Sequence, residues 1–261
     1  MISNHMARNN MTNNQFTLDT IGIISSPFKE KFGIPRQPAL ARHITSDIIV
    51  TPTYSRIEAF KELEQFSHLW LTFVFHQNQR SEWKPCIRPP RLGGNKKVGV
   101  FASRSSFRPN NLGLSAVELV GIQHEKGQIS ITIRGSDLVD GTPIVDIKPY
   151  IPYSDALPHA TAGYANEAPA KPLNVIYSES AIHQLNALDT KRYPNFKLII
   201  EDVLSADPRP AYKRDADPKV YGVKLYDTDI KWRVTGDVVE VLSIEIEVAT
   251  RTNNYHPKTS S

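Results

Sequence analysis

Residues 114–134 read LSAVELVGIQHEKGQISITIR, and this stretch decides the fold class. The run 128–134 alternates polar and apolar residues, which is the period of a strand with one buried face. The run 114–122 before it is equally rich in β-forming residues, and Glu125-Lys126-Gly127 supplies a turn between the two. The stretch therefore predicts a hairpin of antiparallel strands.

Further strands are expected on both sides of this hairpin, at 17–25, 47–51, 98–103 and 143–148. The run LWLTFVF at 69–75 is almost wholly apolar and too short to cross a membrane, so it predicts a strand buried on both faces. Ser55 is placed to cap one helix that continues to Phe66. Because strands follow strands with few helices between them, the sequence predicts a mainly β protein built on a single β-barrel.

The pattern changes after a segment rich in Pro and Ala at 152–172. Helical periodicity covers 179–191 and 196–204, and three strands are expected at 221–226, 230–234 and 238–247. We therefore expect a disordered leader over 1–15, a barrel domain over 16–157 and a small α+β domain over 158–255.

Composition limits the classes of function. Cys86 is the only cysteine, so neither an intrachain disulfide nor a thiolate zinc site can form. The first 15 residues lack the apolar run of a secretory signal, and no apolar stretch reaches membrane-spanning length, so a cytoplasmic protein is expected. Residues 80–108 contain eight Lys and Arg against Glu82 alone, which favours contact with a polyanion over an ordinary solvated loop.

Common catalytic motifs are absent from the sequence. It contains no glycine-rich dinucleotide loop after a strand, no Walker A motif, no H-E-x-x-H, no C-x-x-C and no G-x-S-x-G. The histidines show no metal-ligand spacing, so no metal is expected. On motif chemistry alone, a nucleic-acid-binding barrel is the default interpretation.

Four segments nevertheless contain residues that a plain scaffold does not need. They are the proline-stiffened loop 28–40, the polar residues His76 and Gln77 after the apolar strand, the basic and glycine-rich stretch 88–114, and the acidic stretch 135–150. Within the last stretch Asp140-Gly141 suits a turn, whereas Asp137 has no evident turn role.

At this level of detail the sequence resembles the TsaA-like tRNA methyltransferases. The resemblance rests on SPFKEKFGIPRQPAL, FSHLWLTFVFHQ, RPPRLGGN, VGVFASRSSFRPNNLGLSAVEL and DLVDGTPIVDIKPYIP, and it continues through RYPNF, EDVLSADPRPAYK and YGVKLYD. Members of that family methylate N6 of N6-threonylcarbamoyladenosine at position 37 of tRNA, beside the anticodon. The resemblance implies a β-barrel, S-adenosyl-L-methionine as the methyl donor and a homodimer.

The resemblance also implies which residues bind the cofactor. Carried over to this sequence they are Pro38, Ala39, Leu40, His76, Gln77, Arg104, Leu114, Arg134, Gly135, Ser136 and Asp137. The anticodon arm of tRNA would then be bound by cations, with Arg88, Arg91, Lys96 and Lys97 on phosphates and Arg36, Arg42 or Arg108 on the threonine carboxylate.

The acceptor nitrogen carries a carbonyl substituent and needs a base, for which Asp137, Asp140 and Tyr150 are the candidates. Two alternatives stay open at this stage. One is a non-catalytic RNA-binding barrel, and the other is a methyltransferase that acts on a different nucleoside or a small metabolite.

Overall fold

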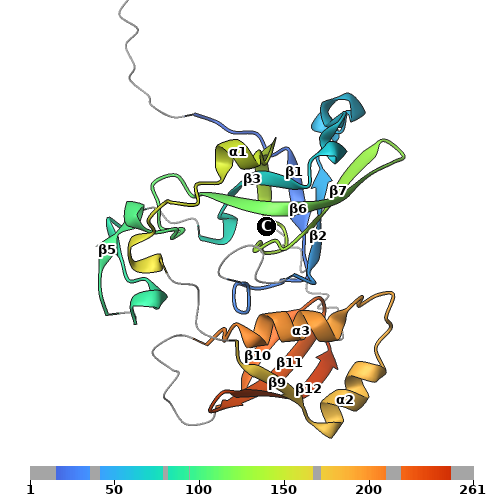
Figure 1. Ribbon diagram of the computed structural model, residues 1–261. Helices are drawn as coiled ribbons and strands as arrows, with labels where there is room; N and C mark the ends of the chain where they lie inside the picture. Colours follow the sequence, from blue (N-terminus) through green and yellow to red (C-terminus); the bar gives the residue numbers. More distant parts are fainter. Residues whose placement is uncertain are drawn as a thin grey trace, which may run out of the picture.

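The computed structural model describes residues 16–35, 42–78, 82–93, 95–166, 172–209 and 219–247. The predicted leader at 1–15 lies outside these residues. Six of the described strands close into a barrel, and four others form a second sheet that carries two helices (Figure 1). The predicted fold class, a mainly β protein with a barrel and a smaller α+β part, is therefore confirmed.

Every neighbouring pair in the barrel is antiparallel, and the order around it is β1-β2-β7-β6-β3-β8. These strands are β1 (Gly22–Ser25), β2 (Thr45–Val50), β3 (His68–Val74), β6 (Leu112–Glu125), β7 (Gln128–Arg134) and β8 (Pro143–Pro149). Closure leaves no free edge among them, which is how all-β folds avoid unpaired backbone groups.

The predicted hairpin is confirmed as β6 and β7, with Glu125 paired to Gln128. Lys126 and Gly127 between them have φ values of 51° and 81°. Positive φ at both central residues is the geometry of a type I′ turn, whose twist matches that of the flanking strands.

The predicted helix from Ser55 to Phe66 is wrong. The chain instead makes short 3₁₀ turns at Pro52–Tyr54, Ile57–Phe60 and Leu63–Gln65, and Glu62 adopts a left-handed φ of 65°. The Ser55 hydroxyl does not cap a helix. It donates to the Gly127 carbonyl and accepts from the Ile129 amide, both at 2.9 Å, so it ties this segment to the hairpin.

Strand β3 is confirmed, but its two faces differ, which corrects the prediction of burial on both. Leu69, Leu71 and Phe73 are buried in the barrel, whereas Trp70, Thr72 and Val74 are half-buried and His68 is exposed. One of these, Trp70, donates from Nε1 to the Asp155 carboxylate in α1 (Pro152–Asp155). The predicted strand at 98–103 is reduced to β5 (Val98–Gly99), which pairs with β4 (Cys86–Ile87) before a 3₁₀ turn.

The second sheet has the order β10-β11-β12-β9. The predicted meander is confirmed as β10 (Tyr221–Leu225), β11 (Thr228–Thr235) and β12 (Val238–Ile246). The two predicted helices are confirmed as α2 (Glu179–Asn186), which ends five residues earlier than predicted, and α3 (Phe196–Ser205). Strand β9 (Asn174–Tyr177), which pairs in parallel with β12, was not predicted. Helix α3 buries Phe196, Ile199, Ile200, Val203 and Leu204.

The segment after β1 joins the two parts of the molecule. Phe28 and Ile44 come from the barrel side of the chain, yet both are fully buried in the core of the second sheet. Phe28 makes an isolated antiparallel bridge with Leu225, and the Tyr226 amide donates to the Pro27 carbonyl at 2.7 Å. The predicted domain boundary at residue 157 stays a prediction. Beyond it, the Tyr164 hydroxyl donates to the Ala102 carbonyl at 3.0 Å.

Among the described residues no helix is both long and apolar enough to span a membrane.

Candidate functional site

Three of the predicted loops meet at one mouth of the barrel, where β3 and β7 end and β8 begins. Residues 75–78 follow β3, residues 103–111 precede β6, and residues 135–142 connect β7 to β8. The Asn78 amide donates to the Ser106 hydroxyl at 2.6 Å, and the Phe75 backbone amide donates to the Asn111 carbonyl at 2.8 Å. The third loop reaches the same place, because a Cβ on Gly141 would lie 3.9 Å from His76 Nε2.

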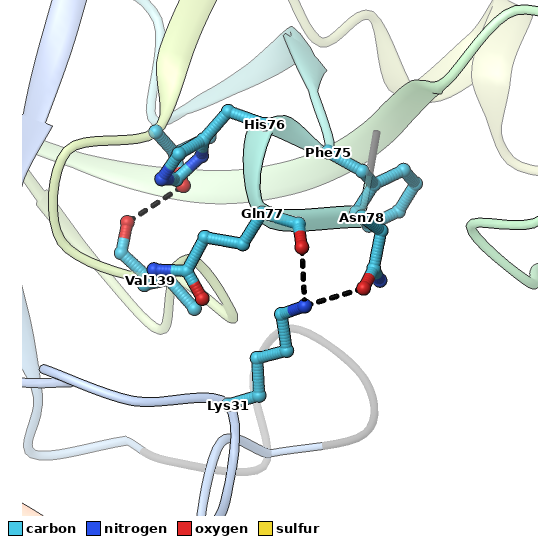
Figure 2. Close-up of a pocket in the computed structure, with 7 residues that line it drawn as sticks. Lys31, Phe75, His76, Gln77, Asn78 and Val139 are labelled. Carbon is cyan, nitrogen blue, oxygen red and sulfur yellow. Dashed lines mark hydrogen bonds between the residues drawn. The ribbon is translucent and has the colours of Figure 1, made fainter. Parts of the chain in front are cut away.

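A small pocket of about 40 Å³ lies beside His76 (Figure 2). Its walls are Lys31, Phe75, His76, Gln77, Asn78, Val139 and Thr142. Burial, and then the charge of Lys31, lower the pKa of His76 below its ordinary value. The imidazole is therefore neutral at pH 7, so it offers one donor and one acceptor to a ligand.

Asp137 lies at the same mouth, in surroundings that oppose its ionisation. Its carboxylate accepts a hydrogen bond from the Ser115 hydroxyl at 2.7 Å. Burial raises the pKa of Asp137 above 3.8, and the Ser115 hydrogen bond and the charge of Arg104 offset only part of that effect. Burial is thus the dominant cause, and a carboxylate with a raised pKa is a stronger base than an exposed one.

The residues just before Asp137 hold its backbone in place. The Gly135 amide donates to the Ile44 carbonyl at 3.0 Å, and Gly135 has a φ of 74° that favours glycine. Ser136 is buried, and its hydroxyl lies 3.0 Å from that of Ser46. Arg134 forms an ion pair with Glu118 at 2.7 Å, in which both side chains are about 40% exposed. These predicted cofactor residues therefore also build the loop.

The other two base candidates are placed differently. The Asp140 carboxylate accepts from the Ser26 amide at 2.9 Å and pairs with Lys29 at 2.8 Å, so it fastens the loop before β8 to the segment after β1. Tyr150 lies next to His68 at the start of β3, where its ring packs against Trp70 at 5.4 Å. The length of β3, roughly 20 Å at 3.3 Å per residue, separates Tyr150 from His76. Within one chain the structure does not bring Tyr150 to this mouth.

Two other predicted cofactor residues, Leu114 and Arg104, have exposed side chains. Leu114 precedes the buried Ser115 on β6, so its side chain faces outward, and it is 57% exposed. Pro38, Ala39, Leu40 and Arg36 lie outside the described residues. Arg42 is described and exposed, just after that gap. Arg104 is exposed as well, and it is close enough to Asp137 to influence its pKa.

The predicted tRNA-binding cations form an exposed stretch around β4 and β5. Arg88, Arg91, Lys96 and Lys97 all have exposed side chains. Arg108 instead donates to the Ser103 carbonyl at 2.7 Å and lies over the Phe101 ring at 5.8 Å. The Phe101 ring stacks with that of Trp83, with centroids 6.2 Å apart. Trp83 was not singled out from the sequence.

Two residues of the mouth were missed by the sequence analysis. Lys31 reaches it from the segment after β1, and Ser115 holds the Asp137 carboxylate from β6. Lys31 lies inside a segment that was singled out, but nothing in the sequence distinguished it from Lys29. Ser115 could have been noticed as a polar residue on the inward face of a barrel strand.

The chemistry of these side chains fits an S-adenosylmethionine ligand. A partly buried carboxylate suits a cationic ligand, the Arg104 guanidinium suits a carboxylate, and Gln77 with the neutral His76 suits a nucleoside. The described residues contain no group of three or more His, Cys, Asp or Glu that could hold a metal ion.

Both parts of the chain match families of known proteins. The family model for the tRNA-methyltransferase O N-terminal domain matches residues 23–156, and the TrmO C-terminal domain matches residues 170–247. The tRNA (adenine(37)-N6)-methyltransferase of Escherichia coli K12 is 47% identical over 231 residues, which are 88% of this chain and 98% of that protein.

Two further relatives agree with this assignment. A probable S-adenosyl-L-methionine-binding protein of Pyrococcus abyssi is 42% identical over 144 residues, which are 55% of this chain and 73% of that one. A crystal structure of TrmO from P. aeruginosa superposes with a TM-score of 0.75 at 37% identity, covering 91% of this chain and 100% of that one. The chain therefore belongs to the tRNA-methyltransferase O family, as its resemblance to the TsaA-like enzymes predicted.

Proposed function

We propose that this protein transfers a methyl group from S-adenosyl-L-methionine to N6 of N6-threonylcarbamoyladenosine at position 37 of tRNA. The observation that carries the proposal is Asp137, a carboxylate with a raised pKa beside Arg104 at the mouth that also holds His76. Membership of the tRNA-methyltransferase O family, and the name of the E. coli relative, support the same reaction.

His76, Gln77, Arg104, Leu114 and residues 134–137 are the proposed cofactor-binding residues, together with Pro38, Ala39 and Leu40. When bound, S-adenosyl-L-methionine supplies a methyl group that its sulfonium centre already activates. The protein therefore contributes mainly by holding donor and acceptor in line, an effect that can reach roughly 7–11 kcal/mol.

Asp137 is the proposed base. The lone pair of the acceptor nitrogen is delocalised into the neighbouring carbonyl, so its proton must leave as the new bond to carbon forms. The Ser115 hydroxyl orients the Asp137 carboxylate, and burial makes that carboxylate hold a proton more readily. The Asp140 carboxylate is already hydrogen-bonded to the Ser26 amide and paired with Lys29, and Tyr150 lies at the far end of β3. Both are therefore weaker candidates for the base.

The tRNA is proposed to bind through its anticodon arm. Arg88, Arg91, Lys96 and Lys97 are exposed and suit phosphate contacts. Arg36, Arg42 and Arg108 are the proposed partners of the threonine carboxylate, since a guanidinium binds such a group through two parallel hydrogen bonds.

A homodimer is proposed to complete the site. The pocket beside His76 measures about 40 Å³, whereas binding sites for ligands as large as S-adenosyl-L-methionine usually span ~300–1,000 Å³. Leu114 is 57% exposed and Phe101 is 70% exposed, so apolar surface near the mouth is left for a second chain to cover. Light scattering should give the mass of two chains, and Leu114→Asp should lower both that mass and the affinity for the cofactor. A single-chain mass for the unmodified protein would remove this part of the proposal.

Nucleoside mass spectrometry tests the reaction itself. Purified protein, S-adenosyl-L-methionine and tRNA that contains threonylcarbamoyladenosine should yield the methylated nucleoside, and tRNA without the threonylcarbamoyl group should not. Saturable cofactor binding in calorimetry with methylation of another nucleoside or metabolite would mean a different substrate. No saturable heat at millimolar cofactor would favour a non-catalytic RNA-binding barrel.

A further inference from the structure

Lys31 occupies a position that the proposed function does not yet use. It lies in the segment after β1 and extends to the end of β3, where it forms one wall of the pocket beside His76 (Figure 2). It also borders a second pocket of about 190 Å³, whose other walls are residues 32–35 together with Val203, Ala206 and Pro208. Lys31 therefore lies between the barrel mouth and the second sheet.

The positive charge of Lys31 is held by neutral groups. Its ammonium donates to the Gln77 carbonyl at 2.7 Å and to the side-chain oxygen of Asn78. Among the described residues no carboxylate forms an ion pair with it, whereas Lys29, two positions earlier, pairs with Asp140 at 2.8 Å. An ammonium group has three donors, so Lys31 keeps one donor and an uncompensated charge at the pocket.

Nothing else that lines this pocket bears a charge at neutral pH. The lowered pKa of His76 makes its imidazole neutral, and the remaining walls are Phe75, Gln77, Asn78, Val139 and Thr142. Lys31 therefore bears the charge among the residues that line this pocket, and an ammonium group favours an anion as ligand.

The backbone on both sides of Lys31 is fixed. Phe32 stacks on Trp232 of β11 with ring centroids 6.5 Å apart, and Phe28 is buried against the second sheet. Gly33 has a φ of 90°, and a Cβ there would lie 2.3 Å from the Val223 side chain. These contacts hold the backbone at Lys31 before any ligand arrives, which reduces the entropy that binding must overcome.

We propose that Lys31 binds a ligand carboxylate in the pocket beside His76. The inference rests on the proposed function, which supplies two carboxylates of the required kind. One is the α-carboxylate of S-adenosyl-L-methionine, and the other is the threonine carboxylate of the modified adenosine. Lys31 acts as a specificity-determining residue for whichever of them occupies the pocket.

The test compares ligands with and without the carboxylate on Lys31→Met, a change that keeps the length of the stem but removes the charge. In the first arm, calorimetry measures binding of S-adenosyl-L-methionine and of decarboxylated S-adenosylmethionine. In the second arm, it measures binding of an anticodon stem-loop with threonylcarbamoyladenosine and of one with N6-(2-hydroxypropyl)carbamoyladenosine, which lacks only the carboxylate. Lys148→Met is the charge-matched control, since Lys148 pairs with Asp146 on the outer face of β8.

The unmodified protein should prefer the carboxylate-bearing ligand by about 10- to 100-fold, the range of a charge-assisted hydrogen bond. Lys31→Met should abolish that preference in the arm whose carboxylate Lys31 binds and leave the other arm unchanged. Lys31→Arg should restore part of the preference, and Lys148→Met should behave like the unmodified protein.

Unchanged preferences in both arms of Lys31→Met would overturn the assignment of Lys31, while methylation by the unmodified protein would leave the proposed function intact. A protein that neither binds the cofactor saturably nor methylates tRNA would instead remove the proposed function, and this inference with it.

Discussion

Asp137 is the residue at which structure and chemistry are most directly linked. Burial opposes its charge, while the Ser115 hydroxyl and Arg104 favour that charge, and burial prevails. The result is a carboxylate that stays at the mouth of the barrel but holds a proton more tightly than an exposed aspartate does.

Asp137→Asn should lower kcat by about 10²–10⁴, the usual contribution of a positioned base. The amide oxygen can still accept from Ser115. Because the neutral amide no longer attracts the cationic cofactor, cofactor affinity should fall as well, and kcat is therefore measured at saturating S-adenosyl-L-methionine. In the unmodified enzyme the rate should fall as the pH drops through the raised pKa of Asp137, because the protonated carboxyl group cannot take the proton from N6. A pH–rate profile measures this, and an acidic limb that persists in Asp137→Asn would exclude Asp137 as the base.

The same substitution makes a prediction for stability. Because the folded-state pKa of Asp137 lies above 3.8, the folded chain binds the proton more tightly than the unfolded chain does. As the pH rises from the unfolded-state pKa of Asp137 to its folded-state pKa, ionisation of Asp137 progressively lowers the stability of the fold. Above the folded-state pKa the full destabilisation is present. Asp137→Asn should consequently be at least as stable as the unmodified protein at pH 7.5 in urea unfolding.

The sequence could single out Asp137 as a candidate because it had no turn role, and the family resemblance placed the same residue among the cofactor-binding positions. It could not separate Asp137 from Asp140 or Tyr150. Asp140 is held by Ser26, 114 residues earlier, and Tyr150 is removed from the mouth by the direction of β8. Both facts depend on long-range pairing that no local pattern contains.

At the scale of elements, the segment 52–65 shows how a long-range contact overrides a local pattern. The 3.6-residue period of its apolar residues predicted a helix, yet Phe60 and Leu63 pack on the barrel core from separate 3₁₀ turns. Instead of capping a helix, the Ser55 hydroxyl bonds to Gly127 and Ile129 at the turn between β6 and β7. Strand β9 was missed for a related reason, since its parallel partner β12 lies more than sixty residues later.

Ser55→Ala should lower the free energy of unfolding by about 1–3 kcal/mol, because it removes two hydrogen bonds and leaves the Ile129 amide without its acceptor. Urea unfolding measures the change. Ser180→Ala, at an exposed position in α2, is the control and should stay within about 0.5 kcal/mol of the unmodified protein. Loss of helical circular dichroism in Ser55→Ala would show that a capped helix exists there after all.

At the scale of the whole molecule, the cations around β4 and β5 should control the salt dependence of tRNA binding. Each phosphate contact contributes about 0.7–0.9 to the slope of log affinity against log salt. Arg91→Ala and Lys97→Ala should each reduce that slope by about 1 and leave cofactor affinity unchanged. Arg104→Ala should instead weaken binding of the cofactor, which calorimetry measures. Equal effects of Arg91→Ala and Arg104→Ala on cofactor affinity would contradict this division.

The second sheet also supports the barrel mouth from outside. The segment after β1 contributes Phe28 to the core of that sheet, Lys29 to Asp140 and Lys31 to the end of β3. Residues 28–31 thus contact the second sheet, the loop before β8 and the end of β3. A disturbance where this segment packs on β10 should therefore reach the site, although no residue of β10 lies in the pocket beside His76.

Gly33→Ala tests this coupling. A methyl group at Gly33 would meet Val223 at 2.3 Å, whereas one at Gly93 would meet nothing within 4 Å, and both glycines have positive φ, of 90° and 70°. Gly93→Ala is therefore the control. Both substitutions carry a backbone penalty of about 1 kcal/mol, so the additional loss of unfolding free energy in Gly33→Ala, expected at about 1–3 kcal/mol, reports the clash with Val223. Urea unfolding and cofactor calorimetry should both show a loss in Gly33→Ala, and adding Val223→Ala should restore part of it. If Gly33→Ala lost stability but kept full cofactor affinity, the second sheet would be shown to stabilise the fold without positioning the site.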